Sequence, residues 1–281
     1  MEYLIVEEKK EIDGVIEKRE ENWAIYYVTE LTDSLKDNIR KNLTAICEGP
    51  DTIDDSYEIT AKEFITRCES TGKQQEKRIV GMIGEFLVHL IILKYYNYIP
   101  ASILFNLEEK SFKKGFDLLL YQSNESKLWI TEVKSGKVSV SEKADGKMGT
   151  LIERAKTDLR ERLNNKDQKQ ELWRNAFFHA KNAIDESKSE RDAIIDLIKD
   201  SFAETKNKPV CSIGDNVILS GVLFHPLEEK AAPTIIKGKQ EKICQEKYNN
   251  DILFKNVVVL AIQEKTCYDV LNFLKDEVNE Q

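Results

Sequence analysis

The strongest pattern in the chain is a pair of apolar runs separated by a short polar break. Gly115–Tyr121 and Leu128–Lys134 are rich in residues that favour strands, and Gln122–Ser126 between them has the composition of a turn. The pattern therefore predicts a β-hairpin. Both faces of this hairpin are mainly apolar, so we expect other elements to cover it on both sides.

The position of the turn determines which side chains share a face. With the hairpin centred between Asn124 and Glu125, Asp117 lies opposite Glu132. Side chains alternate along a strand, so Lys134 points to the same side as Glu132, about 7 Å further along. This face is expected to carry Asp117, Leu119, Tyr121, Leu128, Ile130, Glu132 and Lys134. The opposite face is expected to carry Phe116, Leu118, Leu120, Trp129, Thr131 and Val133.

A long apolar stretch, residues 78–96, precedes the hairpin and predicts a buried helix, because apolar residues occur nearly all round it. Gly81 and Gly84 each cost about 1 kcal/mol of helix stability relative to Ala, which indicates a close approach to a neighbouring element. Glu85 and His89 lie one turn apart on one side of this helix. Glu85 is either a site residue or one half of a buried ion pair, whereas His89 is more typical of a core histidine than of a metal ligand.

The remaining elements follow from the same periodicities. We predict strands at Trp23–Val28, Ser102–Leu107, Asn216–His225 and Phe254–Gln263, and helices at Leu31–Ala45, Thr150–Leu163, Leu172–Phe202 with a break near Ser187, and Cys267–Val278. Polar segments at 46–57, 135–149, 164–170 and 227–250 are interpreted as loops or connectors. Residues 1–75 give the weakest pattern and are interpreted as an N-terminal appendage, either a docking region for a partner or a structural extension. Residues 76–281 would then form the core.

Composition narrows the class of protein. A chain of 281 residues with 41% hydrophobic and 33% charged residues is typical of a globular protein with one large domain, or a domain with an appendage. The sequence contains no run of eighteen apolar residues, so we expect no membrane span, and the N-terminus has no signal-peptide pattern. The five cysteines are scattered and lack CxxC spacing, which favours reduced thiols and a cytoplasmic location.

The distribution of charge adds candidates for nucleic-acid contacts. The net charge of −8 argues against a histone-like DNA-binding protein, but residues 110–169 hold fourteen Lys and Arg against nine Asp and Glu. Four lysines that flank or follow the hairpin suit phosphate contacts, although they suit a solvated loop equally well: Lys114, Lys137, Lys143 and Lys147. Three further cations belong to this locally basic stretch and suit either the surroundings of the site or the solvated side of a helix: Lys156, Arg160 and Arg162.

The opposed carboxylates of the hairpin point to metal chemistry. Like charges about 4 Å apart repel by about 1 to 4 kcal/mol in wet to half-wet surroundings, so Asp117 and Glu132 need a compensating cation. Mg²⁺ is commonly held by one or two carboxylates together with phosphate oxygens and water. Lys134, on the same face, could orient an attacking water or neutralise charge that develops on a phosphate.

Asp117 followed by Glu132-Val133-Lys134 resembles the signature of the PD-(D/E)xK nuclease superfamily, with Phe116 where that signature has Pro. The resemblance implies a restriction-endonuclease-like α/β fold, in which helices flank a central mixed sheet with an αβββαβ core. In that superfamily the first core helix often supplies a further acidic residue to the metal site, and Glu85 matches this position.

A narrower resemblance covers about residues 80–165. The segments GEFLVHLIILKYYNYIPASILF, KGFDLLLY and LWITEVKSGK are similar to HamA-like proteins, the nuclease subunits of the Hachiman anti-phage defence system. This resemblance implies a metal-dependent DNA nuclease that works with a helicase partner. It carries over Glu85, Asp117 and Glu132 as metal ligands, Lys134 as a catalytic residue, and Mg²⁺ as the cofactor, for which Mn²⁺ can substitute.

Two alternatives stay open at this stage. A sequence-specific restriction endonuclease could use the same fold, and would need base-reading loops and usually a symmetric dimer. A non-catalytic interaction or inhibitory subunit could keep a vestigial site, although the presence of Asp117, Glu132 and Lys134 in one register argues against it.

Overall fold

The computed structural model describes residues 11–50, 57–70, 72, 74–105, 115–184, 188–207 and 210–279. Lys114, the end of the strand predicted at Ser102–Leu107, and half of the loop predicted at 46–57 lie outside the described residues.

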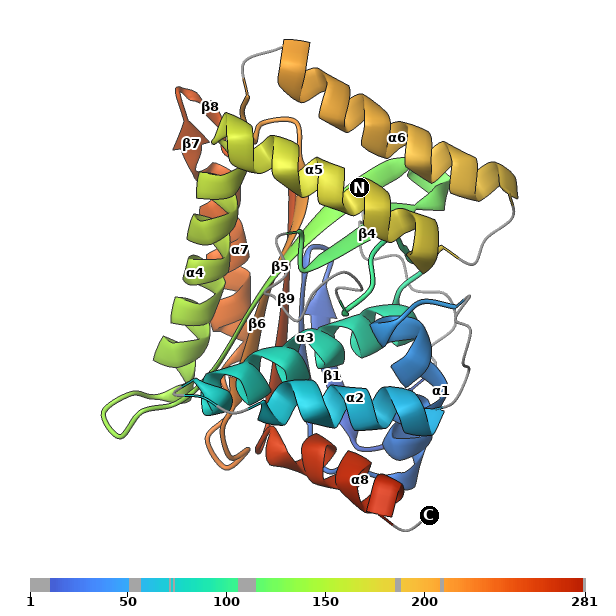
Figure 1. Cartoon of the computed structure of the whole chain (residues 1–281). Coiled ribbons are helices and arrows are strands. Elements are labelled where there is room, and N and C mark those ends of the chain that lie inside the picture. The colour runs from blue at the N-terminus through green and yellow to red at the C-terminus, as the bar shows by residue number, and fades with distance from the viewer. Residues whose placement is uncertain are drawn as a thin grey trace.

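A seven-stranded mixed sheet forms the centre of the molecule, in the spatial order β1-β2-β9-β6-β5-β4-β3 (Figure 1). The strands are β1 (Val15–Glu20), β2 (Trp23–Val28), β3 (Ile99–Pro100), β4 (Leu118–Gln122), β5 (Lys127–Lys137), β6 (Asn216–Phe224) and β9 (Asn256–Glu264). The neighbours β2, β9, β6 and β5 run parallel, whereas β1, β4 and β3 are added antiparallel at the two ends. The strands β2, β6 and β9 are buried along nearly their whole length because helices cover both faces.

Helices cover the two faces of the sheet in separate groups (Figure 1). One face packs against α1 (Asp33–Cys47), α2 (Tyr57–Glu69), α3 (Gln75–Tyr95) and α8 (Tyr268–Asn279), and the other against α4 (Ala144–Leu163), α5 (Lys166–Ala183) and α7 (Pro233–Gln245). The remaining helix, α6 (Lys188–Asn207), packs on α5. A small separate ribbon pairs β7 (Lys247–Tyr248) with β8 (Asp251–Ile252). None of the described helices has both the length and the apolar character needed to cross a membrane.

The hairpin has the predicted register. Leu119 pairs with Ile130 and Tyr121 with Leu128, and the chain reverses through a short 3-10 turn at Ser123–Glu125. The expected alternation is confirmed, since Leu119 and Ile130 belong to the core beneath α4 while Leu118, Leu120, Trp129 and Val133 belong to the core beneath α3. Phe116 is the exception: it precedes the strand and packs on the α4 side.

Several predicted boundaries differ from the structure. The segment Ser102–Phe105 is not a strand, because the backbone N–H groups of Leu104 and Phe105 donate to the last carbonyls of α1, at Ile46 and Cys47, each over 2.8 Å. The helix predicted from Thr150 begins at Ala144 instead, and the linker predicted at 164–170 is mostly the first turn of α5. The charged connector predicted at 227–250 contains α7, which begins at Pro233.

The N-terminal region takes part in the central sheet. β2 pairs in parallel with β9, and β1 pairs with β2. Across the expected boundary at residue 75, α1 and α2 both contact α3. Residues 15–28 are therefore strands of the main sheet, and the docking role of this region stays a prediction.

Candidate active site

The candidate site lies where β4 and β5 separate. Regular pairing of the hairpin ends at Leu118 and Thr131, so Asp117 stands just outside β4. Its Oδ2 accepts a hydrogen bond from the backbone N–H of Val133 over 2.8 Å. This bond holds the Asp117 carboxylate against β5, beside Glu132, which the predicted register places opposite Asp117.

Glu132 is the buried centre of the site, with a relative exposure of 2%. Its Oε1 accepts a hydrogen bond from Lys134 Nζ over 2.7 Å, and Lys134 also lies 2.9 Å from Oδ2 of Asp158 in α4. Burial raises the pKa of Glu132 to about 7, and the Asp117 charge pushes it in the same direction, while Arg162 and Lys134 oppose the rise. The two carboxylates therefore interact electrostatically, as their expected opposition requires.

Arg162 is a member of the site, although the sequence alone left both a site role and a solvated helix face open for it. It donates to Oε2 of Glu132 and lies 3.4 Å from the backbone oxygen of Gly115. Asp158 and Arg162 are one turn apart on α4, next to the apolar stripe that faces the sheet. The position of Arg162 beside this apolar stripe is the sequence signal for its role. It identifies Glu132 as the partner only once α4 is known to pack on β5.

The other two cations of this helix have different roles. Lys156 is buried and forms an ion pair with Glu246, with its Nζ 2.7 Å from Oε2, so it does not lie on a solvated face. Arg160 is more exposed, and its guanidinium lies 3.8 Å from Glu161. Of these three cations, Arg160 alone has the solvated position.

The helix α3 approaches the other side of β5 very closely. A Cβ built on Gly84 would lie 1.9 Å from Oγ of Ser135, which confirms that this glycine permits contact between helix and sheet. A Cβ on Gly81 would meet nothing within 4 Å. His89 is buried, and its Nε2 lies 3.4 Å from the backbone oxygen of Asp117, consistent with a structural histidine.

Glu85 is half-buried on α3, one turn before His89. Within the described part of the chain, no three His, Cys, Asp or Glu side chains are grouped so as to hold a metal ion. The structure thus brings Asp117, Glu132 and Lys134 together, and Glu85 does not complete a three-carboxylate set with them. Its assignment as a metal ligand stays a prediction.

The three candidate phosphate-binding lysines that the structure describes lie away from this carboxylate pair. Lys137, at the end of β5, is 2.7 Å from Oε1 of Glu76 on the α3 side of the sheet. Lys147, in the first turns of α4, is 3.1 Å from Oε2 of Glu142, and Lys143 immediately precedes the helix and is exposed. Eleven helical residues separate Lys147 from Asp158, which corresponds to about 16 Å along α4.

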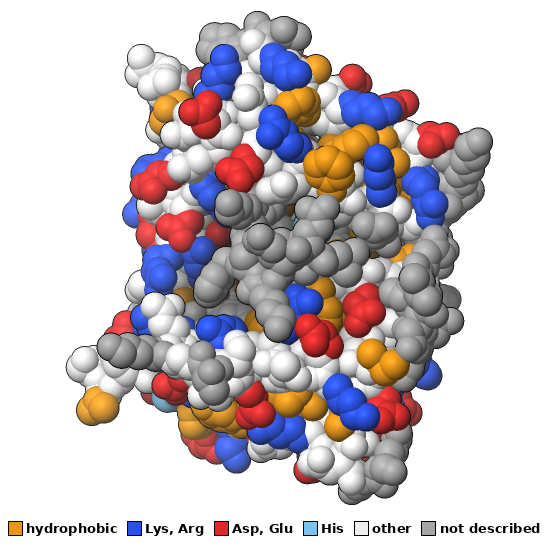
Figure 2. Space-filling model, in the orientation of Figure 1, with side chains coloured by type: hydrophobic (Ala, Val, Ile, Leu, Met, Phe, Trp, Pro, Cys, Tyr) orange, Lys and Arg blue, Asp and Glu red, His pale blue; other side chains and the backbone are white. Residues whose placement is uncertain are grey.

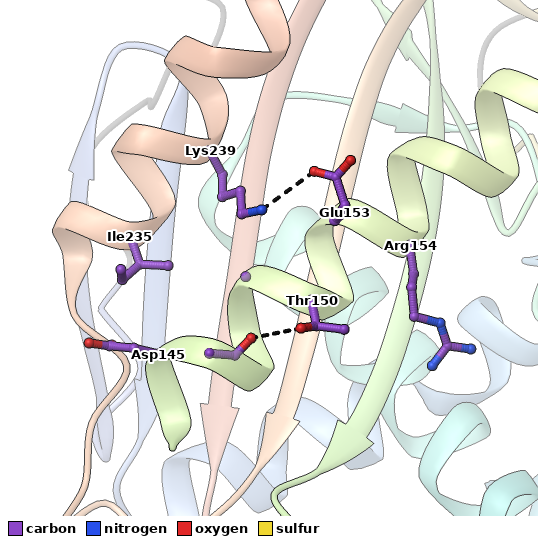
Figure 3. Close-up of a pocket in the computed structure, with 8 residues that line it drawn as sticks. Asp145, Thr150, Glu153, Arg154, Ile235 and Lys239 are labelled. Carbon is purple, nitrogen blue, oxygen red and sulfur yellow. Dashed lines mark hydrogen bonds and ion pairs between the residues drawn. The ribbon is translucent and has the colours of Figure 1, made fainter. Parts of the chain in front are cut away.

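A separate pocket of about 400 Å³ lies between α4 and α7 (Figure 3). Lys239 of α7 reaches across toward Glu153 of α4, with Nζ 3.4 Å from Oε2, and Thr150 donates to the Gly146 carbonyl oxygen. This pocket shares no lining residue with the site of Asp117 and Glu132, so it lies outside the candidate chemistry.

Comparison with known proteins supports the narrower resemblance. The sequence model of HamA matches residues 4–272, nearly the whole chain and including both the hairpin and the N-terminal strands. No curated protein and no solved structure matches the chain. The match supports the expected link with antiviral defence. Because the match extends over far more than half of the chain, the chain belongs to the HamA family.

Proposed function

We propose that this HamA-family protein is a metal-dependent DNA nuclease that hydrolyses phosphodiester bonds. The observation that carries the proposal is the juxtaposition of Asp117, Glu132 and Lys134 at the split end of the hairpin. Membership of the HamA family supports a place in an anti-phage defence complex of the Hachiman type, with a helicase as partner.

The residues of the site fit a hard divalent cation. Asp117 and Glu132 offer carboxylate oxygens, the donors that Mg²⁺ prefers, and two carboxylates supplemented by water and substrate phosphate are a common set for this ion. Burial, and after it the charge of Asp117, raises the pKa of Glu132, so the ionised pair calls for positive charge between or beside the two carboxylates. Lys134 and Arg162 supply that charge in the structure, so a metal ion would share or replace their contacts with Glu132.

The proposed division of labour follows from these contacts. Asp117 and Glu132 would hold Mg²⁺, or Mn²⁺ in its place. When bound, the metal would polarise the substrate phosphate and lower the pKa of a bound water. Lys134, held between Glu132 and Asp158, would donate to the attacking water or to a phosphate oxygen as negative charge grows there. Arg162, which donates to Oε2 of Glu132, would hold that carboxylate in place.

Digestion of linear and closed circular DNA by the purified protein, with Mg²⁺ or with EDTA, tests this proposal. We expect cleavage that requires the metal and is lost in Glu132→Gln. The same digest with and without the helicase partner tests whether the partner delivers the substrate. Discrete fragments would indicate a restriction endonuclease, and the absence of metal-dependent cleavage under both conditions would indicate a non-catalytic subunit.

A further inference from the structure

The outer face of the α5–α6 pair carries aromatic rings and cations together. On α5, four residues at positions i, i+3, i+4 and i+7 share one face: Arg174, Phe177, Phe178 and Lys181. On α6, Phe202 and Lys206 share a face in the same way. Figure 2 shows hydrophobic side chains bordered by Lys and Arg over these two helices. We call these six residues the aromatic–cation surface.

Contacts join the two helices into one surface. Lys181 Nζ lies 4.5 Å from the centre of the Phe177 ring, and Lys206 Nζ lies 4.6 Å from that of Phe202. The Arg174 guanidinium lies 6.0 Å from the Phe202 ring, which links α5 to α6. Phe178 is the most exposed member at 53%, and it meets Phe177 edge to face with ring centres 5.7 Å apart.

The exposure of Phe178 is unusual for its helix. The core of α5 is satisfied without it, since Leu172, Trp173, Ala176 and Ala180 are buried against the sheet side. The acidic residues of α6 that follow a four-residue spacing form a stripe of their own, apart from Phe202: Asp192, Asp196, Asp200 and Glu204. The aromatic–cation surface therefore holds three cations, with the acidic Glu171 one turn before Arg174 at its edge, in a chain whose net charge is −8.

The same helix reaches the candidate site on its inner side. Trp173 packs edge to face on Phe116, the residue before Asp117, with ring centres 5.0 Å apart. A Cβ on Gly115 would meet Asn175 at 3.7 Å. One turn of α5 therefore separates Trp173, which packs beside Asp117, from Phe177 and Phe178.

We propose that the aromatic–cation surface binds single-stranded DNA next to the nuclease site, an inference that rests on the proposed function for its substrate. Exposed aromatic rings stack on bases, and lysines and arginines beside them pair with the phosphates. A single strand presents base faces for this contact, whereas duplex bases are already stacked on one another. Three cations set around three rings complement a polyanion with aromatic bases better than they complement an uncharged apolar segment.

Fluorescence anisotropy of a labelled thymidine oligonucleotide with the full chain, in EDTA, tests the inference without cleavage. We expect Phe178→Ala to raise the dissociation constant roughly tenfold, the effect of losing one stacked base. We expect Lys181→Gln to reduce the slope of log K against log salt by about 0.7, the value for one lost phosphate contact on a single strand. Ile59→Ala and Lys62→Gln on α2 are matched controls, since Ile59 is 48% exposed and Lys62 is also exposed, and both should bind like the wild type.

Three results would overturn the inference: no binding of the oligonucleotide by the wild type, unchanged binding by Phe178→Ala, or equal losses in Phe178→Ala and Ile59→Ala. Circular dichroism of each variant checks that the fold is intact. Because binding is measured without metal, it is independent of catalysis. Strand binding without metal-dependent cleavage would refute only the proposed function, and cleavage with unchanged binding by Phe178→Ala would refute only this inference.

Discussion

The contact between Arg162 and Glu132 gives a prediction about stability that does not depend on enzymatic activity. Glu132 is 2% exposed and its carboxylate accepts from two cations, Lys134 on its own strand and Arg162 on α4. Arg162→Gln removes one of these cations and leaves the buried carboxylate beside Asp117 with Lys134 alone. We expect the folded state to lose stability because a buried charge is then under-compensated.

The magnitude follows from burial. Removing one partner of a fully buried ion pair costs about 3 to 5 kcal/mol, but the Arg162 side chain is 26% exposed and Lys134 still contacts Glu132, so we expect about 2 kcal/mol. For a chain of this size that loss lowers the melting temperature by about 4 to 8 °C. The pKa of Glu132 should rise further, because Arg162 is one of the groups that lower it.

A double-mutant cycle measured by urea denaturation separates this coupling from general damage. Glu132→Gln together with Arg162→Gln removes both charges, so its loss should be smaller than the sum of the two single losses by at least about 1 kcal/mol. Additivity within about 0.5 kcal/mol would refute the coupling. Arg160→Gln, a change of the same type at an exposed neighbour on α4, should leave stability nearly unchanged.

Two further predictions test the packing and the titration of the same site. Gly84→Ala should destabilise the fold by about 2 kcal/mol and reduce cleavage, because the new Cβ would lie 1.9 Å from Oγ of Ser135. Gly81→Ala in the same helix should leave stability unchanged or raise it by up to about 1 kcal/mol. Thermal melts of the two variants compare these effects, and equal changes in melting temperature would contradict the close approach of α3 to β5. Glu132 has a raised pKa of about 7, so its protonated form favours the folded state and that stability is present below about pH 4 and lost as the pH rises through about 7. In EDTA, the melting temperature of Glu132→Gln should therefore fall less between about pH 5 and 7 than that of the wild type, and parallel curves would show that Glu132 titrates normally.

Local patterns predicted the hairpin well because its information is contained within twenty residues. The polar break fixed the turn, and alternation of apolar residues then fixed the register that pairs Leu119 with Ile130. The contact of Lys134 with Glu132 follows from the same alternation. Helix α3 was equally clear, since a long apolar stretch with two glycines allows few other interpretations.

Contacts between distant segments could not be read in the same way. Arg162 meets Glu132 only because β6 pairs in parallel with β5 and α4 packs over both. The segment Ser102–Phe105 has strand-forming residues, yet its N–H groups complete the end of α1. The N-terminal strand β2 looked isolated in sequence because its partner, β9, lies more than two hundred residues away.

The central claim is tested most directly by the rate of DNA cleavage. The purified Lys134→Ala and Lys127→Ala variants are compared on a labelled DNA oligonucleotide in Mg²⁺. Both lysines lie on β5 and both contact a carboxylate, but Lys127 pairs with Glu125 at the turn, at the other end of the strand. We predict that Lys134→Ala loses at least about a hundredfold in rate while Lys127→Ala cleaves like the wild type. Wild-type cleavage by Lys134→Ala, with its fold intact, would contradict the account.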